Sequence, residues 1–173
     1  SDFKQENTRL HTGASVPEGH FDALIIESTY ANRSHPSREQ VEREIMKIIK
    51  DTINAGGNVL FPTFAVGRTQ ELALVLAAHK IDVPIYIHGM GRTASEITVN
   101  YPGYVKNAGE LKKALASFRE VGRDRSIVTK DPSIIVATSG MLEGGPAISY
   151  LLALDQKKRD KDVDSSVVFT GFC

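Results

Sequence analysis

The chain has 173 residues, 41% of them hydrophobic, which suits a single domain with a buried core. Its 21 basic residues balance its 21 acidic ones, so the net charge does not indicate binding to nucleic acid or to a membrane. A local basic patch is compatible with this balance. The single cysteine, Cys173, excludes an internal disulfide, and no signal peptide or apolar run of about 18 residues is present. We expect a cytoplasmic protein without a membrane segment.

Residues 1–22 are polar and contain Gly13, Pro17 and Gly19, so they predict an irregular lead-in to the domain. The chain begins at Ser1 without a methionine and ends in the strand-like run 167–173. We therefore expect part of a longer protein, truncated at both ends, with an α/β domain over residues 23–173.

The first predicted strand, Ala23–Tyr30, is an apolar run that ends in a carboxylate and three hydroxyls. Ligands of open α/β sheets bind beyond the carboxyl ends of such strands, which makes Glu27 the first candidate for function. The alternative is that Glu27 only caps or tethers the following loop, as carboxylates at strand ends often do.

Strands and helices alternate along the rest of the chain. Further strands are predicted over residues 58–64, 83–88, 133–138 and 167–173. Helices are predicted from the capping residue Ser37 to Gly56, over 69–80, near 93–100, over about 108–119, and from Pro146 to a charged loop at 155–164. This alternation predicts a parallel, Rossmann-like open sheet of about five strands with helices on both faces.

Small polar residues recur where these strands end. In a parallel sheet the turns meet at one edge, where amides, hydroxyls and helix amino termini can bind phosphate oxygens. The candidate phosphate-binding residues are Ser28, Thr29, Arg68, Thr138, Ser139 and Gly140. The alternatives are that these residues merely form short turns, and that Arg68 makes a surface ion pair.

The common catalytic motifs are absent. Ser139 lacks the preceding glycine of a nucleophile elbow, and there is no Walker loop, His-x-x-x-His pair or Cys-x-x-Cys pair. A carboxylate, hydroxyls and an arginine remain, which can hold a substrate but are too few to cleave one.

Five motifs, taken together, resemble the β-CASP region of metallo-β-lactamase-fold nucleases, closest to the nuclease branch of the cleavage and polyadenylation specificity factor and its archaeal and bacterial relatives. They are Ser1-Asp-Phe3, Leu24-Ile-Ile-Glu-Ser-Thr-Tyr30, Phe61-Pro-Thr-Phe-Ala-Val-Gly-Arg-Thr-Gln-Glu71, Ala137-Thr-Ser-Gly-Met-Leu142 and Thr170-Gly-Phe-Cys173.

The resemblance implies a domain that clamps RNA over a two-zinc centre held by a metallo-β-lactamase domain of the same chain. It implies that Asp2 bridges the metals and that Glu27 orients a proton-transferring histidine beyond Cys173. It places Arg68, Ser139 and Gly140 at the cleft, and it leaves a homodimer open. The parent protein is then a zinc-dependent ribonuclease, acting as an endonuclease, a 5′-exonuclease or both, in RNA processing or mRNA 3′-end maturation.

The zinc-binding His-x-His-x-Asp-His cluster of that family is absent from these residues. Asp2 alone cannot hold two zinc ions, so we expect this segment to be inactive and metal-free by itself. Two alternatives are a catalytically inactive RNA-binding scaffold and a stand-alone nucleotide-binding α/β domain.

Overall fold

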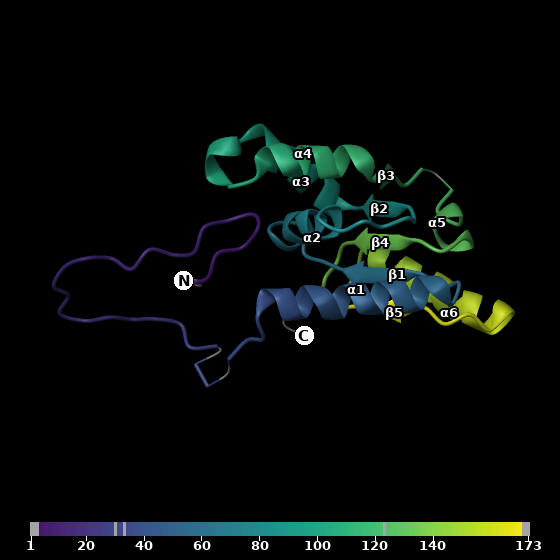
Figure 1. The fold of residues 1–173 in the computed structure, drawn as a ribbon, viewed down its shortest axis with the longest axis horizontal. Helices are drawn as coiled ribbons and strands as arrows, with labels where there is room; N and C mark the ends of the chain where they lie inside the picture. Colours follow the sequence, from purple (N-terminus) through teal and green to yellow (C-terminus); the bar gives the residue numbers. More distant parts are fainter. Residues whose placement is uncertain (1–3, 30, 33, 123, 171–173) are drawn as a thin grey trace.

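The computed structural model describes residues 4–29, 31–32, 34–122 and 124–170. Its centre is a five-stranded, all-parallel sheet with the strand order β3-β2-β4-β1-β5 (Figure 1), which confirms the predicted α/β fold. The strands are β1 (Val59–Pro62), β2 (Ile85–His88), β3 (Arg119–Glu120), β4 (Ile134–Ala137) and β5 (Ser166–Val167).

Helices connect the strands and cover both faces of the sheet. They are α1 (Arg38–Asn54), α2 (Arg68–Ala77), α3 (Met90–Asn100), the 3₁₀ turn η1 (Pro102–Tyr104), α4 (Ala108–Ser117), α5 (Ile127–Lys130) and α6 (Pro146–Lys161). No helix in the described part of the chain is long and apolar enough to span a membrane.

Alternate residues of the central strands face two separate apolar cores, as the side-chain alternation of a strand requires. Val59 and Phe61 of β1 face the core to which α1, α2 and α4 contribute, whereas Leu60 faces the core under α5 and α6. Because β1 and β4 are buried on both faces, their sequences are continuous apolar runs.

The strand predicted at Ala23–Tyr30 is wrong for its described residues. Residues 23–29 pair with no strand, and Ile25 is 98% exposed. Figure 1 shows this part of the chain in a long extended excursion away from the sheet. An apolar run predicts a strand only if another strand pairs with it and its apolar face is covered, and neither condition is met here.

Two boundaries also differ from expectation. The stretch between α4 and β4, where the sequence predicts no strand or helix, contains the short edge strand β3 and the helix α5. The charged region 155–164, expected to be a loop, is helical as far as Lys161. The ion pairs Arg159–Asp155 and Lys158–Asp162 have the i,i+4 spacing that stabilises a charged helix.

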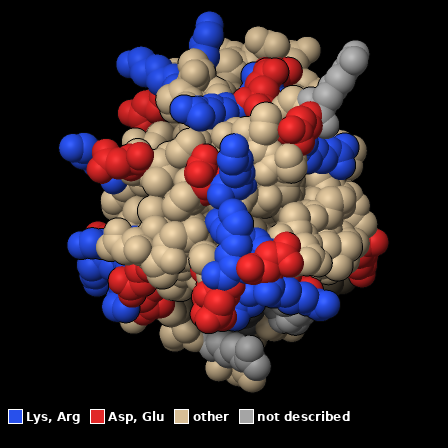
Figure 2. All heavy atoms as spheres, turned by 90° about the vertical axis from the view of Figure 1, so that its right-hand side faces the viewer, with Lys and Arg blue, Asp and Glu red and all other residues tan. Residues whose placement is uncertain are grey.

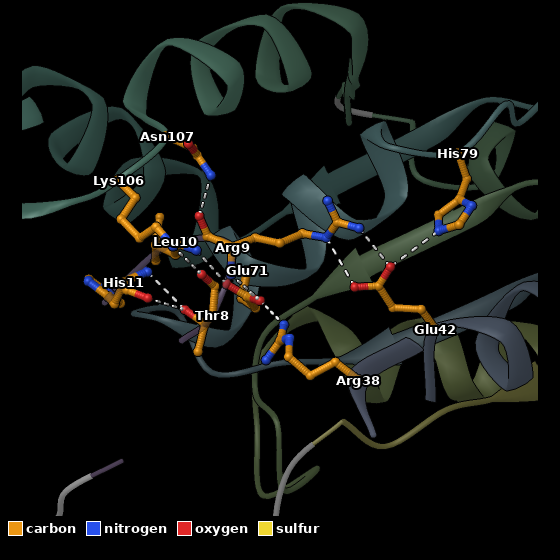
Figure 3. A network of polar contacts seen from close by, with 10 residues as sticks. All are labelled: Thr8, Arg9, Leu10, His11, Arg38, Glu42, Glu71, His79, Lys106 and Asn107. Carbon is orange, nitrogen blue, oxygen red and sulfur yellow. Dashed lines mark hydrogen bonds and ion pairs between the residues drawn. The ribbon is translucent and has the colours of Figure 1, made fainter. Parts of the chain in front are cut away.

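A polar network attaches the chain before α1 to the helices (Figure 3). The buried Glu71 of α2 accepts hydrogen bonds from the N–H groups of Arg9 (3.0 Å) and Leu10 (2.8 Å), and it forms an ion pair with Arg38. The Arg9 guanidinium binds the Glu42 carboxylate, whose pKa this contact lowers. Leu10 is only 1% exposed, so this contact gives the irregular segment a place in the core.

Candidate nucleic-acid interface

The register of the sheet brings three strand ends together. Pro62 of β1 and His88 of β2 both lie beside Ala137 of β4, because β4 runs between the two other strands. The turns that follow these residues therefore share one edge of the sheet, as predicted from the alternation of strands and helices. In Figure 1 this edge faces the extended segment that precedes α1.

The turn between β1 and α2 is held by internal hydrogen bonds. The hydroxyl oxygens of Thr63 and Thr69 lie 2.9 Å apart, and the Thr69 hydroxyl donates to the carbonyl of Phe64 at 2.7 Å. Gly67 has φ +79°, a left-handed conformation that favours glycine and lets the chain turn sharply into α2. The turn thus has a defined shape before any ligand binds.

Gln70 fixes this turn to α3. Its fully buried amide group donates to the carbonyl of Ala65 (2.9 Å) and to the hydroxyl of Ser95 (2.7 Å), while its carbonyl accepts from the N–H of Gly67 (2.6 Å). A buried amide with all these partners holds two loops in one arrangement.

Arg68, the first residue of α2, is exposed next to this turn. Its main-chain N–H bonds to the carbonyl of Val66 at 3.0 Å, but its guanidinium has no hydrogen bond or ion pair with any described residue. The described residues therefore do not support the alternative in which Arg68 forms a surface ion pair. The site offers a free cation with five N–H donors, a group suited to phosphate oxygens.

The turn between β4 and α6 contains three of the predicted phosphate-binding residues. The carbonyl of Thr138 accepts from the N–H of Ala147 (2.9 Å), and the N–H of Ser139 donates to the carbonyl of Gly144 (3.3 Å). No hydrogen bond among the described residues uses the hydroxyl of Ser139 or the N–H of Gly140. Both groups are donors without a partner in the described chain; Ser139 is partly exposed, whereas Gly140 is buried against the neighbouring turn.

The two turns pack directly against each other. A Cβ atom at Gly140 would lie 3.0 Å from the main-chain nitrogen of Phe64 and 3.1 Å from the carbonyl carbon of Thr63. Only a glycine therefore fits without displacing the neighbouring turn. This contact brings the Ser139–Gly140 donors and the turn that carries Arg68 into one site.

His88 lies at the same edge of the sheet, and its ring is held by a contact with α6. Its Nδ1 is 2.8 Å from the hydroxyl of Tyr150 in α6, and the two rings meet edge to face with centroids 5.7 Å apart. Burial lowers the pKa of His88, and the charge of Arg125 lowers it further. Burial also raises the pKa of Tyr150 to about 12, so the tyrosine remains a neutral hydrogen-bonding partner.

Glu27, Ser28 and Thr29 are not part of this site. The carboxylate of Glu27 accepts from the N–H of Thr29 at 2.9 Å, a contact that lowers the pKa of Glu27, and the carbonyl of Ser28 accepts from Ala31 at 3.1 Å. These bonds are local to the turn. The arrangement matches the alternative in which Glu27 caps the loop after it, and the roles expected for these three residues stay predictions.

The described residues do not fit a metal centre. No group of three His, Cys, Asp or Glu side chains among them lies close enough to hold an ion. Asp2, which the resemblance assigns to the metals, lies outside the described residues. Arg68 and Ser139 offer side-chain donors without a partner among the described residues, and the role of these residues in binding stays a prediction.

The supporting residues Thr69 and Gln70 were not predicted. The sequence of α2 is largely apolar and suggests a covered helix, so polar residues in its first turn read as ordinary capping. No local signal marks Gln70, because its contacts with Gly91 and Ser95 are more than 20 positions away in the sequence.

The opposite end of the sheet carries charges of both signs (Figure 2). Figure 2 shows the face at the right of Figure 1, where basic and acidic side chains are mixed. Ion pairs at the end of α6 include Arg159 with Asp155 and Lys158 with Asp164. Paired charges of both signs give no continuous track for phosphates.

Comparison with known proteins adds the family. Residues 69–173 match the Beta-Casp domain. The chain is 40% identical over 158 residues to "Probable RNase MJ4" of Methanocaldococcus jannaschii, covering 87% of this chain and 37% of that protein. It is 34% identical to "RNase aCSPSF2" of Saccharolobus solfataricus (92% of this chain, 33% of that protein) and 36% identical to "Transcription termination factor FttA" of M. jannaschii (99% and 29%).

The α/β fold, the strand-end site and the matched residues define one class: this chain belongs to the Beta-Casp domain family. The resemblance to β-CASP nucleases is thereby confirmed, and the archaeal relatives are consistent with the branch of the cleavage and polyadenylation specificity factor nuclease. The chain spans about a third of the length of the relatives it matches.

Proposed function

We propose that this chain is the RNA-clamping domain of a zinc-dependent ribonuclease that hydrolyses phosphodiester bonds during RNA processing. The observation that carries the proposal is the exposed guanidinium of Arg68, which has no partner among the described residues and belongs to the turn that packs against Gly140 at the carboxyl edge of the sheet. Relatives whose names describe them as RNases support RNA as the ligand.

The described residues have a binding role in this proposal. Arg68 neutralises a backbone phosphate, while the Ser139 hydroxyl and the Gly140 N–H donate to phosphate oxygens. Such contacts hold RNA in register without reading its sequence. The two zinc ions are expected on residues other than those described, since these do not form a metal site.

Glu27 is proposed as a positioning residue that orients a histidine outside this chain. The local bond to Thr29 lowers the pKa of Glu27, which favours the ionised form that this role requires. A metallo-β-lactamase domain in the same protein and a cytoplasmic location complete the proposal.

An RNA cleavage assay of the full-length protein tests it. Glu27→Ala should slow cleavage about 10- to 100-fold, the usual effect of losing a partner that orients a histidine, while the exposed Glu18→Ala should cleave at the wild-type rate. An unchanged rate for Glu27→Ala removes Glu27 from the mechanism. RNA binding without any cleavage by the wild-type protein identifies the scaffold alternative instead.

A further inference from the structure

Two tyrosines stand out on the turn between α3 and α4. Tyr101 is 62% exposed and Tyr104 is 82% exposed, whereas Tyr86 and Tyr150 are buried in the core under the sheet. No hydrogen bond among the described residues uses either exposed hydroxyl. Exposing a large aromatic ring to water is unfavourable in free energy, so exposed rings often mark a binding surface.

The backbone that carries these rings is well fixed. The N–H of Tyr104 donates to the carbonyl of Tyr101 at 3.2 Å, closing the 3₁₀ turn, and Pro102 restricts the turn between them. Val105, directly after the turn, packs against the apolar core. The rings are therefore presented on a rigid support, which reduces the entropy lost when a ligand stacks on them.

A cation, Lys106, follows the second tyrosine by two residues. Lys106 is exposed, its ammonium group donates to the carbonyl of Thr8 at 3.5 Å, and it forms no ion pair within the described chain. Its own main-chain N–H bonds to the carbonyl of Leu10 at 2.8 Å, so its backbone is fixed as well. Aromatic rings next to a positive charge are the combination that single-stranded nucleic acid requires.

The tyrosine turn also lies within reach of the candidate interface. Helix α3 begins at Met90, directly after β2 ends, and its 11 residues span about 16 Å before Tyr101. A strand bound at Arg68 and Ser139 can therefore continue along α3 to η1 as a chain of several nucleotides.

We propose that Tyr101 and Tyr104 form a stacking platform for the bases of single-stranded RNA, with Lys106 contacting a phosphate of the same strand. This inference rests on the proposed RNA-binding function and adds a second contact site outside the strand-end turns. Stacking on tyrosine tolerates any base, so the platform holds the strand without selecting a sequence.

Fluorescence anisotropy of the full-length protein tests the platform with two labelled ligands. One is an oligouridylate of about 12 nucleotides, within the usual range of single-strand sites, and the other is a ribose-phosphate oligomer of the same length without bases. The variants are Tyr101→Ala/Tyr104→Ala, the matched Tyr101→Phe/Tyr104→Phe, which keeps the rings, and Arg68→Ala.

The double alanine variant should bind oligouridylate about tenfold more weakly and the base-free oligomer as well as wild type does. The double phenylalanine variant should match wild type on both ligands. Unchanged binding of oligouridylate by the alanine variant overturns the inference and leaves the tyrosines to a protein contact; an equal loss on both ligands also overturns it.

Arg68→Ala separates this inference from the function on which it rests. A loss on both ligands in Arg68→Ala, with no loss in the double alanine variant, supports the strand-end interface and overturns the platform alone. A wild-type protein that binds neither ligand overturns both.

Discussion

Gly140 lies against the main chain of Phe64, so close that a Cβ at this glycine would be 3.0 Å from the Phe64 nitrogen. The turns after β1 and β4 come from residues more than 70 positions apart, yet this contact makes them one surface. The proposed RNA site depends on their being held together.

Gly140→Ala should therefore push the two turns apart. We expect a destabilisation of about 1–3 kcal/mol, the usual cost of an added methyl group in a packed site, and weaker RNA binding. Denaturant unfolding and a binding titration measure both effects. Gly144→Ala is the matched control, because a Cβ at Gly144 meets nothing within 4 Å; equal behaviour of the two variants would contradict the contact.

Gln70→Ala should lower stability by about 2 kcal/mol or more, because it leaves buried partners such as the Ala65 carbonyl without a hydrogen bond. It should also weaken RNA binding, since the turn carrying Arg68 loses its attachment to α3. Thermal unfolding provides the measurement, with Gln156→Ala as the control on an exposed pair with Asp160. Melting temperatures equal to wild type for both would show that Gln70 does not hold the turn.

His88 should make stability fall in mild acid. Its folded-state pKa is lowered, by burial first and by Arg125 second, so the unfolded state takes up the proton more readily. This contribution is complete above the unfolded pKa of about 6.5 and is lost as the pH falls from there through the lower folded pKa.

His88→Gln should therefore reduce the slope of unfolding free energy against pH between about pH 7 and pH 5. Denaturant titrations at several pH values measure that slope. The exposed His20→Gln is the control and should keep the wild-type slope. A wild-type slope in His88→Gln as well would refute the role assigned to burial.

Glu71→Ala should release the segment around Leu10 from the helices. The carboxylate accepts two main-chain hydrogen bonds and pairs with Arg38, so its loss should cost about 2–3 kcal/mol. Trypsin should then cut after Arg9 faster than in wild type. Glu44→Ala, which removes only an exposed contact with Gln40, should leave the cleavage rate unchanged; equal rates in both variants would argue against the anchor.

The sheet and most helices could be predicted because their apolar residues have the spacing of the element they form. In α1 and the central strands, local pattern and tertiary packing agree. The run at Leu24–Ile26 has the same local signal but pairs with no strand, and sequence alone does not say whether a partner exists. Helix α6 is longer than predicted, because ion pairs at i,i+4 spacing stabilise its charged end. In the sequence the same charged residues resemble a solvated loop.

Part of the candidate site could be predicted because it depends on the topology of the sheet. Arg68, Ser139 and Gly140 follow strand ends, and parallel topology brings strand ends together. The prediction failed to bring in Glu27, because its expected strand is not in the sheet. It also missed Gln70, whose role depends on contacts with Gly91 and Ser95 that are distant in sequence.

The most direct measurement is hydrogen–deuterium exchange of the full-length protein with and without single-stranded RNA. The account predicts slower exchange on RNA binding in residues 63–69 and 139–145, and loss of that protection in Arg68→Ala but not in the oppositely placed Arg159→Ala. Protection confined to α5 and α6, with the strand-end turns unaffected, would contradict it.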